Sequence, residues 1–462
     1  MEQRYDVAVL GGGPAGYVAA IRAAQLHAKV VLFEEDVVGG TCLNRGCIPT
    51  KTYLKTAQTL REIRTAAERG IVVNGDAKVD MPAAVACKNR VVKTLTGGVA
   101  ALLKTNHVTV VAGQARAESA RTVSCGGTLY EADRLILCGG SLPSLPPIPG
   151  IEGRDVLTST ELLDRQSIPQ SLCIIGGGVI GCELASVFRS FGAEVCIVEQ
   201  AERLAPMFEK DISEEVAASL KKSGVKLLLA TGVVRIETLE KGSCVVTEKE
   251  RVACDCILAA TGRKPNLSCL GELAGKLRIE SGRVAVNDYL ETGVPNVYAC
   301  GDITGRMMLT HAAFAMGRIA AENCLGARVR CDLSRTPNCM YAQPEVASVG
   351  LTEEAARAAI GEKLCVGRFR IGANGRAVAY GEREGFVKVV ADRSTGELLG
   401  VHIVGPVANE LISEAAAAME GEMTLSQITN RIVHPHPSFS EAFYEACLDA
   451  LDIGIHQPPR KK

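Results

Sequence analysis

The chain of 462 residues contains no tryptophan, and aromatic residues make up only 4% of it. It also has little net charge, because 51 basic and 52 acidic side chains nearly cancel. Without a basic field, we expect no nucleic-acid partner. No run of 18 apolar residues occurs, so we expect no membrane-spanning helix and no membrane partner.

Targeting signals are absent from the first residues as well. Residues 1–6 lack the basic region and cleavage site of a signal peptide, and they are neither Arg-rich nor Ser-rich. The 18 cysteines are scattered without the spacing of a small disulfide framework, which favours reduced thiols in a reducing compartment. None of them forms a metal-type cluster. We therefore predict a cytoplasmic protein without a metal site.

What the chain does contain is a repeated pattern of strand, glycine turn, helix and strand. It occupies residues 6–34 and again residues 172–199, within a length that predicts about three domains. Four pairs of positions are each 165 residues apart: Gly11 and Gly176, Gly13 and Gly178, Gly16 and Gly181, Glu34 and Glu199. One such pair is weak evidence, but four at one offset predict two copies of a mononucleotide-binding half-fold.

The remainder of the chain does not repeat this pattern. The Pro-rich segment 142–150 is predicted to link the two copies. Beyond Pro344, strand-like runs precede helices, which predicts a separate α+β domain that ends in a frayed terminus at Lys461 and Lys462. The helix expected before this domain is 311–324. The strands expected within it are 364–370, 386–391 and 398–404, and the helices are 408–420 and 440–451.

The first glycine turn, Gly11-x-Gly13-x-x-Gly16, has the chemistry of a pyrophosphate site. Its glycines permit a tight turn, close approach of backbone to phosphate and close packing of helix on strand. The helix N-terminus then faces the phosphates with its partial positive charge. Glu34, 18 residues after Gly16, is placed to accept hydrogen bonds from ribose hydroxyls. A glycine-rich turn alone would be weak evidence, but the flanking strand, helix and acid favour a dinucleotide site.

In the second copy, the acid also suggests which cofactor is bound. A carboxylate at Glu199 repels a 2′-phosphate and therefore favours NAD over NADP. Arg203 lies four residues further on, so use of NADP stays open at this point.

Cys42 and Cys47 lie just beyond the first copy of the pattern. Five steps along a regular helix advance about 7.5 Å, which exceeds the roughly 7 Å Cα separation that a disulfide allows. A bond between them would require a distorted segment, and Gly46 provides that freedom. If the helix becomes regular near Cys47, its N-terminus favours a thiolate there. The alternative is two unconnected buried thiols.

The segment Gly39–Lys51 (GGTCLNRGCIPTK) resembles the redox motif of the pyridine nucleotide–disulfide oxidoreductases, most closely that of the dihydrolipoamide dehydrogenases within this family. The resemblance covers essentially the whole chain. Further motifs follow in the order of the family: Thr261–Asn266, Val297–Asp302, Tyr341–Gly350 and His434–Glu441.

The resemblance implies an α/β fold with two Rossmann-like dinucleotide-binding domains, one for FAD and one for NAD, and a C-terminal α+β dimerisation domain. The implied bounds are 1–148 for the first part of the FAD-binding domain, 149–275 for the NAD-binding domain, 276–344 for a central segment that completes the FAD-binding region, and 345–462 for the dimerisation domain.

The resemblance also implies roles for individual residues. Cys42 corresponds to the thiol that exchanges with substrate, and Cys47 to the thiol in charge transfer with the flavin. Lys51 is expected near the flavin, paired with Glu183. Ala115, Gly140, Asp302 and Met308 to His311 are implied to contact FAD, and Val233 and Gly262 to contact NAD.

His436 and Glu441 resemble the catalytic acid–base pair of the family, whereas His434 does not match that position. Such a pair suits the chemistry, because only a thiolate attacks a disulfide and a histidine oriented by a carboxylate can take the proton near neutral pH. In the family, this pair completes the site of the partner subunit, so a homodimer is implied.

The implied activity is oxidation of a dihydrolipoyl-lysine carried by another protein, either a lipoyl-bearing acyltransferase or a glycine-cleavage carrier. Electrons would pass through a Cys42–Cys47 disulfide and FAD to NAD⁺. The first alternative is an NADPH-dependent disulfide reductase of the glutathione or mercuric type, which Glu199 and the lack of a C-terminal cysteine pair oppose. The second is a flavin-bound regulatory protein without catalysis, which the intact thiols and His436 oppose.

Two features depart from the pattern or are ambiguous. The family commonly has Ala-Thr-Gly-Ser where this chain has Cys138-Gly-Gly-Ser141, a change that we expect to loosen a contact with FAD. Arg45, inside the redox motif, either favours the thiolate or faces solvent.

Overall fold

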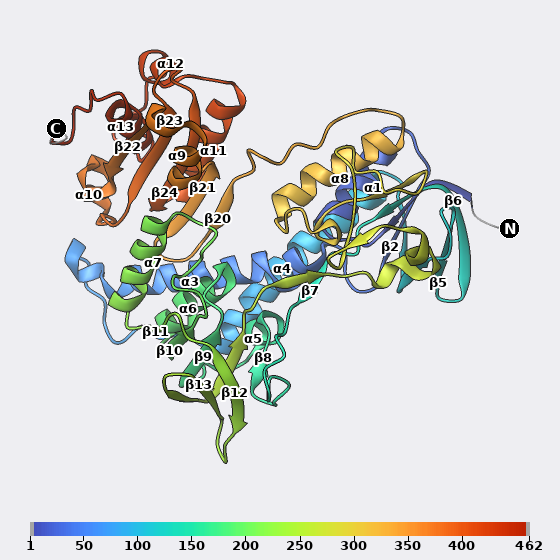
Figure 1. Cartoon of the computed structure of the whole chain (residues 1–462). Helices are drawn as coiled ribbons and strands as arrows, with labels where there is room; N and C mark the ends of the chain where they lie inside the picture. Colours follow the sequence, from blue (N-terminus) through green and yellow to red (C-terminus); the bar gives the residue numbers. More distant parts are fainter. Residues whose placement is uncertain (1–3, 459–462) are drawn as a thin grey trace.

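The computed structural model describes residues 4–458, so Lys461, Lys462 and the extreme ends of the first and last predicted domains lie outside it. A mixed sheet, a parallel sheet and an antiparallel sheet, each with helices, form the centres of three bodies (Figure 1). This architecture confirms the predicted α/β class with a third, α+β unit. The domain boundaries themselves stay a prediction. Within the described residues, no helix is long and apolar enough to cross a membrane.

The first sheet is parallel in its central part and antiparallel at one end. Its order is β3-β2-β1-β6-β5-β4, and β19 also pairs with β6. The strands are β1 (Arg4–Leu10), β2 (Val30–Glu34), β3 (Thr109–Ala112), β4 (Ala115–Ala117), β5 (Thr122–Cys125), β6 (Thr128–Leu137) and β19 (Val297–Ala299). Because β19 lies some 160 positions after β6 in the chain, the central segment returns to complete the first sheet.

Two helices, α1 (Pro14–Gln25) and α8 (Thr310–Cys324), share a core beside this sheet. A side chain at Gly317 could not be accommodated, because its Cβ would lie 2.3 Å from the carbonyl oxygen of Ala15. α1 begins at Pro14, a residue that suits the first turn of a helix. The close contact places the N-termini of both helices at one end of the sheet.

Two long helices connect the first body to the second (Figure 1). They are α3 (Cys47–Arg64) and α4 (Met81–Thr105), preceded by the short α2 (Gly40–Arg45) and separated by a 3₁₀ turn, η1 (Ala66–Arg69). Tyr53 of α3 is fully buried against Phe191 of the second body, and its hydroxyl donates to the carbonyl of Leu163 at 2.8 Å. The helix that begins at Cys47 is therefore held between the first and the second body.

The second sheet is entirely parallel, in the order β11-β10-β9-β15-β8. A separate antiparallel sheet, β12-β13-β14, packs next to it. The strands are β8 (Val156–Leu157), β9 (Ser171–Ile175), β10 (Glu194–Val198), β11 (Lys226–Leu228), β12 (Val233–Thr238), β13 (Ser243–Thr247), β14 (Arg251–Cys254) and β15 (Cys256–Ala259). The helices are α5 (Ser159–Asp164), α6 (Val179–Phe191) and α7 (Lys210–Lys222).

The chain passes between the two sheets at two neighbouring places. The segment predicted as a linker, 142–150, begins inside β7 (Ser141–Pro143), which pairs antiparallel with β16 (Arg263–Pro265). The outgoing and returning segments therefore form one small ribbon, and the start of the linker is a strand rather than a loop. The returning chain continues through η2 (Ser268–Lys276), β17 (Ile279–Glu280), β18 (Arg283–Val284) and η3 (Asp302–Thr304).

The third body is an antiparallel sheet in the order β20-β21-β24-β23-β22. Its strands are β20 (Asn338–Met340), β21 (Glu345–Gly350), β22 (Leu364–Arg370), β23 (Phe386–Asp392) and β24 (Leu398–Gly405). Its helices are α9 (Glu353–Ile360), α10 (Gly375–Tyr380), α11 (Ala408–Glu420), α12 (Leu425–Arg431) and α13 (Glu441–Ala450), with short 3₁₀ turns η4 (Gly361–Lys363) and η5 (Ile371–Ala373). Strand β22 and helix α11 have the bounds that the sequence predicts.

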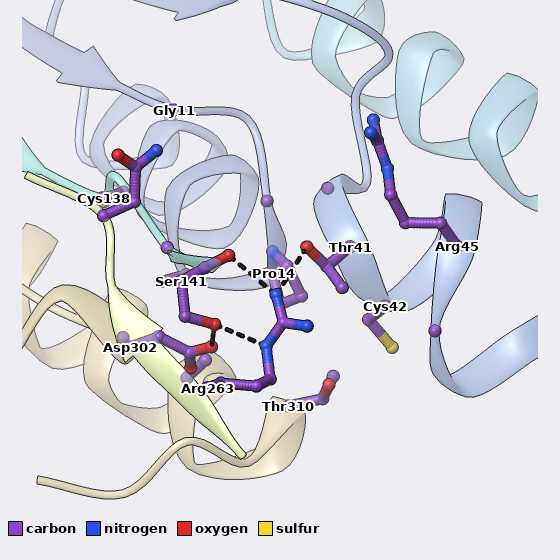
Figure 2. Close-up of a pocket in the computed structure, with 18 of the residues that line it drawn as sticks. Gly11, Pro14, Thr41, Cys42, Arg45, Cys138, Ser141, Arg263, Asp302 and Thr310 are labelled. Carbon is purple, nitrogen blue, oxygen red and sulfur yellow. Dashed lines mark hydrogen bonds between the residues drawn. The ribbon is translucent and has the colours of Figure 1, made fainter. Parts of the chain in front are cut away.

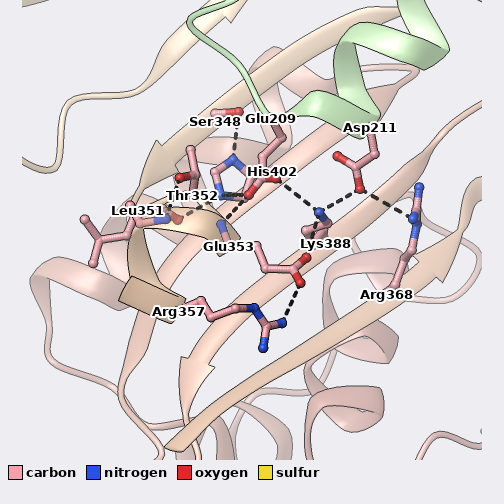
Figure 3. Close-up of polar contacts among 11 residues, drawn as sticks. Glu209, Asp211, Ser348, Leu351, Thr352, Glu353, Arg357, Arg368, Lys388 and His402 are labelled. Carbon is pink, nitrogen blue, oxygen red and sulfur yellow. Dashed lines mark hydrogen bonds and ion pairs between the residues drawn. The ribbon is translucent and has the colours of Figure 1, made fainter. Parts of the chain in front are cut away.

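A buried lysine ties the third body to the second (Figure 3). Lys388 of β23 has a side chain only 6% exposed, and its ammonium lies 3.2 Å from Glu209, 2.6 Å from Asp211 and 3.1 Å from Glu353. Glu209 and Asp211 belong to the start of α7, whereas Glu353 begins α9. A buried ammonium needs such partners, so these ion pairs fix the second body against the third.

Candidate active site

The predicted site residues of the first body gather around one cavity of about 670 Å³ (Figure 2). It lies at the carboxyl ends of the parallel strands of the first sheet, where the turn before α1, the α2–α3 segment and the start of α8 meet. The predicted residues in its wall are Gly11, Gly13, Glu34, Cys42, Cys47, Lys51, Ala115, Gly140, Glu183, Asp302 and His311.

The glycine turn has the shape that a phosphate group needs. Gly11 has a φ of +104°, and a Cβ there would lie 2.3 Å from the carbonyl oxygen of Cys138. Helix α1 then begins at Pro14 with no side chain capping its N-terminus. Gly16 does not line the cavity. A Cβ on Gly16 would lie 1.8 Å from the carbonyl oxygen of Gly11, so the helix packs closely on the turn here. Gly16 therefore allows the helix to pack, while the uncapped N–H groups of α1 face the cavity.

Glu34 and Glu199 are held in the same way in the two nucleotide-binding bodies. Glu34 accepts hydrogen bonds from the backbone N–H of Gly12 at 2.7 Å and of Asp36 at 3.0 Å. Glu199 accepts them from the N–H of Gly177 at 2.6 Å and of Ala201 at 2.7 Å. Both pairs of donors are again 165 positions apart in the sequence. The repeat therefore extends to the hydrogen bonds that orient each carboxylate.

Arg203 is the residue whose position in the sequence left the use of NADP open. Its side chain does not turn toward Glu199. Its guanidinium donates to the carbonyl of Pro206 at 3.1 Å.

The two cysteines of the redox motif are separated by a break in the helix. α2 ends at Arg45, Gly46 adopts φ −137° and ψ −106°, and α3 begins at Cys47. The distortion predicted at Gly46 and the regular helix predicted from Cys47 are therefore both present. Both cysteines are free thiols in the structure, and they lie close enough for each to shift the pKa of the other. Because both cysteines are free here, the disulfide between them and the alternative of two unconnected thiols both stay predictions.

The two thiols differ in acidity. The hydrogen bond from Cys42 lowers the pKa of Cys47 despite burial, and the Thr310 hydroxyl and the Lys51 charge lower it further. The same hydrogen bond and burial raise the pKa of Cys42. The arrangement therefore favours a neutral Cys42 beside a Cys47 thiolate, which is the reactive form of a thiol.

Lys51 and Glu183 meet at the cavity wall, although they come from α3 and α6. The ammonium of Lys51 lies 3.0 Å and 2.9 Å from the two carboxylate oxygens of Glu183. Glu183 is 3% exposed and also accepts the backbone N–H of Tyr341 at 2.8 Å. The ring of Tyr341 lies beneath the ammonium, 4.4 Å away. The positive charge is thus fixed close to the thiols.

Arg263 and Thr310 also belong to the site, although Arg263 had no predicted role and Thr310 was predicted only as part of the Met308–His311 segment. Arg263 donates from Nε to the Ser141 hydroxyl at 2.8 Å and from Nη2 to the Ser141 carbonyl at 2.7 Å (Figure 2). Ser141 in turn donates to Asp302 at 2.6 Å. Arg263 lies inside the motif Thr261–Asn266, and Thr310 lies inside the segment Met308–His311. The resemblance to the family therefore pointed to both places in the sequence. What the sequence could not provide was their contact with Ser141 and Cys47.

His436 and Glu441 contact each other away from this cavity. His436 Nδ1 lies 2.8 Å from Glu441 Oε1, and the other carboxylate oxygen accepts the N–H of Ser438 at 2.8 Å. Burial tends to raise the pKa of Glu441, but hydrogen bonds from Ser438 and His436 lower it overall, so this carboxylate is charged at neutral pH. The His436 side chain is 78% exposed. It is therefore free to meet another surface.

His434 differs from His436 in its surroundings. Its side chain is 5% exposed, bonds Glu414 at 2.6 Å and packs on the ring of Tyr444. A buried histidine held in this way suits a structural role.

The remaining predicted residues lie beside or away from the cavity. Met308 precedes Leu309 and Thr310, which line it. Arg45 lines the cavity, but it forms an ion pair with Asp36 and its side chain points away from Cys42 (Figure 2). The positions in or near the second body are Gly176, Gly178 and Gly181 around the start of α6, Val233 at the start of β12, and Gly262 before β16.

Relatives of known name match the chain over nearly its whole length. Residues 5–317 match the pyridine nucleotide-disulphide oxidoreductase family, and residues 336–447 match the dimerisation domain of that family. The dihydrolipoyl dehydrogenase of Chlamydia muridarum is 38% identical, with 100% of both chains covered. That of Bacillus subtilis is 38% identical over 97% of this chain and 99% of its own. That of Thermus scotoductus is 41% identical over 98% of each.

Solved structures agree with this result. The HOCl-induced flavoprotein disulfide reductase RclA of Escherichia coli has a TM-score of 0.87 and 30% identity, and the match covers 96% of this chain and 99% of RclA. LpdA of Mycobacterium tuberculosis has a TM-score of 0.88 and 27% identity, with the same coverage. The resemblance stated from the sequence is confirmed: the chain belongs to the pyridine nucleotide-disulphide oxidoreductase family and carries its dimerisation domain.

Proposed function

We propose that this protein is a homodimeric enzyme that oxidises dihydrolipoyl groups and passes the electrons to NAD⁺. The observation that carries the proposal is the contact between the Cys42 and Cys47 thiols in the wall of the cavity, beside the Lys51–Glu183 ion pair. Full-length relatives named dihydrolipoyl dehydrogenase support the choice of substrate. We propose a lipoyl-lysine on an acyltransferase or a glycine-cleavage carrier as the natural partner.

FAD and NAD are the cofactors of this family, and the residues present fit them. The uncapped start of α1 suits a pyrophosphate, and Glu34 is held by two backbone N–H groups at the end of β2, where a ribose hydroxyl could donate to it. The cavity has the volume of a cofactor site. Gly13, Ala115, Gly140, Asp302 and the Met308–His311 segment would hold FAD. Gly176, Gly178, Gly181, Glu199, Val233 and Gly262 would hold NAD.

The proposed reaction begins with proton transfer to His436. This histidine takes a proton from one thiol of the dihydrolipoyl group, because a thiolate is the species that attacks a disulfide. Glu441 orients the imidazole through the 2.8 Å hydrogen bond and stabilises its charged form. Since His436 is exposed and lies outside the cavity wall of its own chain, we propose that it acts on the thiols of the other subunit.

Thiol–disulfide exchange then transfers the electron pair. The substrate thiolate attacks Cys42 of the oxidised pair, and Cys47 leaves as a thiolate. The second substrate thiol displaces Cys42, which closes the lipoyl ring and leaves Cys42 protonated. The protein has then gained two electrons. Its two cysteines are in the protonation states that their pKa shifts favour, a neutral Cys42 thiol beside a Cys47 thiolate. Bound FAD supplies the redox chemistry that carries these electrons onward to NAD⁺.

Replacement of either thiol tests this proposal. Cys42→Ser and Cys47→Ser should each reduce the NAD⁺-dependent oxidation of dihydrolipoamide by more than about a thousandfold, because the exchange loses its nucleophile or its leaving group. Cys87→Ser, which changes a partly exposed cysteine of α4 outside the cavity, is the matched control and should retain activity. Full activity in Cys47→Ser would reject the proposed electron transfer.

A disulfide reductase is the second candidate, because the flavoprotein disulfide reductase RclA has a similar structure, and the form that we consider would use NADPH. The carboxylate of Glu199, held at the end of β10, opposes it. Initial rates with NADH and NADPH, measured against lipoamide and glutathione disulfide, distinguish the two activities.

A further inference from the structure

The cavity wall contains a second pair of thiols in contact. Cys138 follows β6, and Cys300 follows β19. Their sulfur atoms lie 3.4 Å apart, and the two residues are 6% and 1% exposed. Both line the cavity that we assign to FAD. The pair is separate from Cys42 and Cys47, and the proposed reaction does not use it.

The backbone at this place permits a disulfide. β19 and β6 are neighbouring parallel strands with Ala299 opposite Leu137, so the next residues on each strand, Cys300 and Cys138, are also opposite. The N–H of Cys300 donates to the carbonyl of Leu137 at 3.1 Å, which continues the ladder. Neighbouring strands are about 4.8 Å apart, within the Cα separations of about 4.4–6.8 Å that disulfides span. The sulfurs need to approach by about 1.4 Å to bond.

There is little room beside the pair for such a movement. A Cβ at Gly11 would lie 2.3 Å from the carbonyl oxygen of Cys138. A Cβ at Gly16 would lie 3.3 Å from the Cβ of Cys138. On the other side, a Cβ at Gly301, next to Cys300, would lie 2.9 Å from the Cβ of Ala15. The glycine turn that faces the phosphates is therefore packed against the backbone at both cysteines. A close-packed interior transmits a shift at one group to its neighbours.

Each cysteine also begins a segment that reaches the proposed flavin site. Cys138 is followed by Gly140 and Ser141, and Cys300 is followed by Asp302. The two segments are joined, because Ser141 donates to Asp302 at 2.6 Å. A change in the separation of the two cysteines would therefore move both flavin-contacting segments as well as the phosphate turn.

We propose that Cys138 and Cys300 are a reversible oxidation site whose disulfide weakens the binding of FAD. The inference rests on the proposed function, because it assumes that the cavity binds a flavin. When the bond forms, each thiol loses a proton and the pair loses two electrons. Hydrogen peroxide accepts both, its O–O bond breaks, and two water molecules leave. A small dithiol reverses the step by thiol–disulfide exchange.

The surroundings of the pair make this oxidation slow. The hydrogen bond with Cys300 and then burial raise the pKa of Cys138 well above its ordinary value, so little thiolate exists at neutral pH. The pKa of Cys47 is shifted in the opposite direction, and the oxidation of Cys47 with Cys42 belongs to the catalytic cycle. The Cys138–Cys300 bond therefore responds to sustained oxidant rather than to turnover, and an excess of FAD, which would cover the cavity wall, should retard it.

The test uses the purified holoenzyme in its oxidised form, in which the proposed Cys42–Cys47 disulfide already exists. Incubation with hydrogen peroxide should produce a cross-linked peptide that contains Cys138 and Cys300, seen by mass spectrometry under non-reducing conditions. FAD fluorescence should show release of the flavin in parallel, with a dissociation constant at least fivefold higher after oxidation. Added FAD should slow the cross-link, and dithiothreitol should restore the original dissociation constant.

Variants separate this bond from general oxidative damage. Cys138→Ala and Cys300→Ala should each bind FAD equally well before and after peroxide treatment. The matched control is Cys196→Ala, since Cys196 and Cys173 are another buried pair on neighbouring parallel strands, but outside the cavity. This control should lose FAD in peroxide as the wild type does. If both cavity variants fail to fold, the cross-link and the flavin titration of the wild-type protein still decide the matter.

Two results would overturn the inference. One is a fully oxidised protein without the Cys138–Cys300 cross-link, and the other is a cross-linked protein that binds FAD as tightly as the reduced one. Neither result would affect the proposed function. A purified protein that binds no flavin under any condition would instead reject the proposed function itself.

Discussion

The hydroxyl of Thr310 lies 3.4 Å from the sulfur of Cys47, although the two residues are 263 positions apart in the chain. Thr310 is the first residue of α8, and Cys47 is the first residue of α3. The hydroxyl lowers the pKa of both cysteines of the pair, in addition to the larger effects that they have on each other. The packing of α8 on α1 thus helps to set the charge of a thiol on another helix.

Thr310→Val removes this hydroxyl and keeps the shape of the side chain. A hydrogen bond to a charged group is worth about 1.5–3 kcal/mol, so the pKa of Cys47 should rise by about one unit or more. The rate of alkylation of the reduced protein by iodoacetamide, followed against pH, measures it. Thr310→Ser restores the hydroxyl and should return the midpoint to the wild-type value. Equal midpoints for the valine variant and the wild type would show that Thr310 has no influence on the thiolate.

Glu441→Gln tests the pair formed by His436 and Glu441. The amide keeps a hydrogen bond to the imidazole but cannot stabilise its positive charge, so kcat for dihydrolipoamide should fall about 10- to 100-fold. His436→Gln should reduce it by about 10²–10⁴, the usual contribution of a general base. His456→Gln is the control, because His456 forms a similar exposed pair with Glu445 at 2.7 Å. A Glu441 variant with wild-type kcat would contradict the proposed role.

Glu199 is expected to determine the choice of nucleotide. Its two hydrogen bonds from backbone N–H groups hold a negative charge at the end of β10, where a 2′-phosphate would be repelled. The wild-type enzyme should therefore use NAD⁺ in preference to NADP⁺. Glu199→Gln should lower the ratio of the two kcat/KM values at least about tenfold, since it removes about 1.4 kcal/mol or more of discrimination. Glu194→Gln, an exposed change on the same strand, should leave the ratio unaltered.

Much of the fold could be predicted from the sequence because its signals are local. The glycine turns, the strands on either side and the acids at their ends lie within 30 residues of one another in each copy. The long helix α4 had no such signal and received no prediction, and α3 was predicted only at its start, near Cys47. Tyr53 and Val85 share a core with Phe188 and Leu162 of the second body, whereas Val99 and Leu103 of α4 belong to the core beside the first sheet. Which face of such a helix is buried depends on a partner far away in the sequence.

The site shows the same limit. Cys42, Cys47 and Lys51 come from one segment and were predicted together, whereas Arg263 and Thr310 reach them only after the chain has passed through the second body. The contact between Cys138 and Cys300 likewise depends on the pairing of β19 with β6, which joins residues 162 positions apart. Spacing in the sequence carries no information about such pairs.

Lys388 is a further case, because a lysine in a strand ordinarily indicates a face exposed to water. Here every residue of β23 is buried, and Lys388 is accommodated by carboxylates that come from α7 and α9 (Figure 3). Arg357 and Lys388 together lower the pKa of Glu353, although burial tends to raise it. The network therefore depends on charges that acid would remove.

Lys388→Met should destabilise the protein at pH 7, because it leaves Glu209, Asp211 and Glu353 close together without their common cation. Removal of one partner of a buried ion pair costs about 3–5 kcal/mol, which urea denaturation can measure. Lys222→Met, which breaks an exposed ion pair between α7 and Glu384, should cost less than about 1 kcal/mol.

The loss in Lys388→Met should also depend on pH. A carboxylate whose pKa is lowered by folding contributes stability above its unfolded pKa and loses that contribution as the pH falls through its folded pKa. Glu353 is such a group, and Lys388 is one cause of its shift. The difference in unfolding free energy between wild type and variant should therefore shrink as the pH falls below about 4. A difference that is small at pH 7, or that grows in acid, would show that Lys388 does not act through these carboxylates.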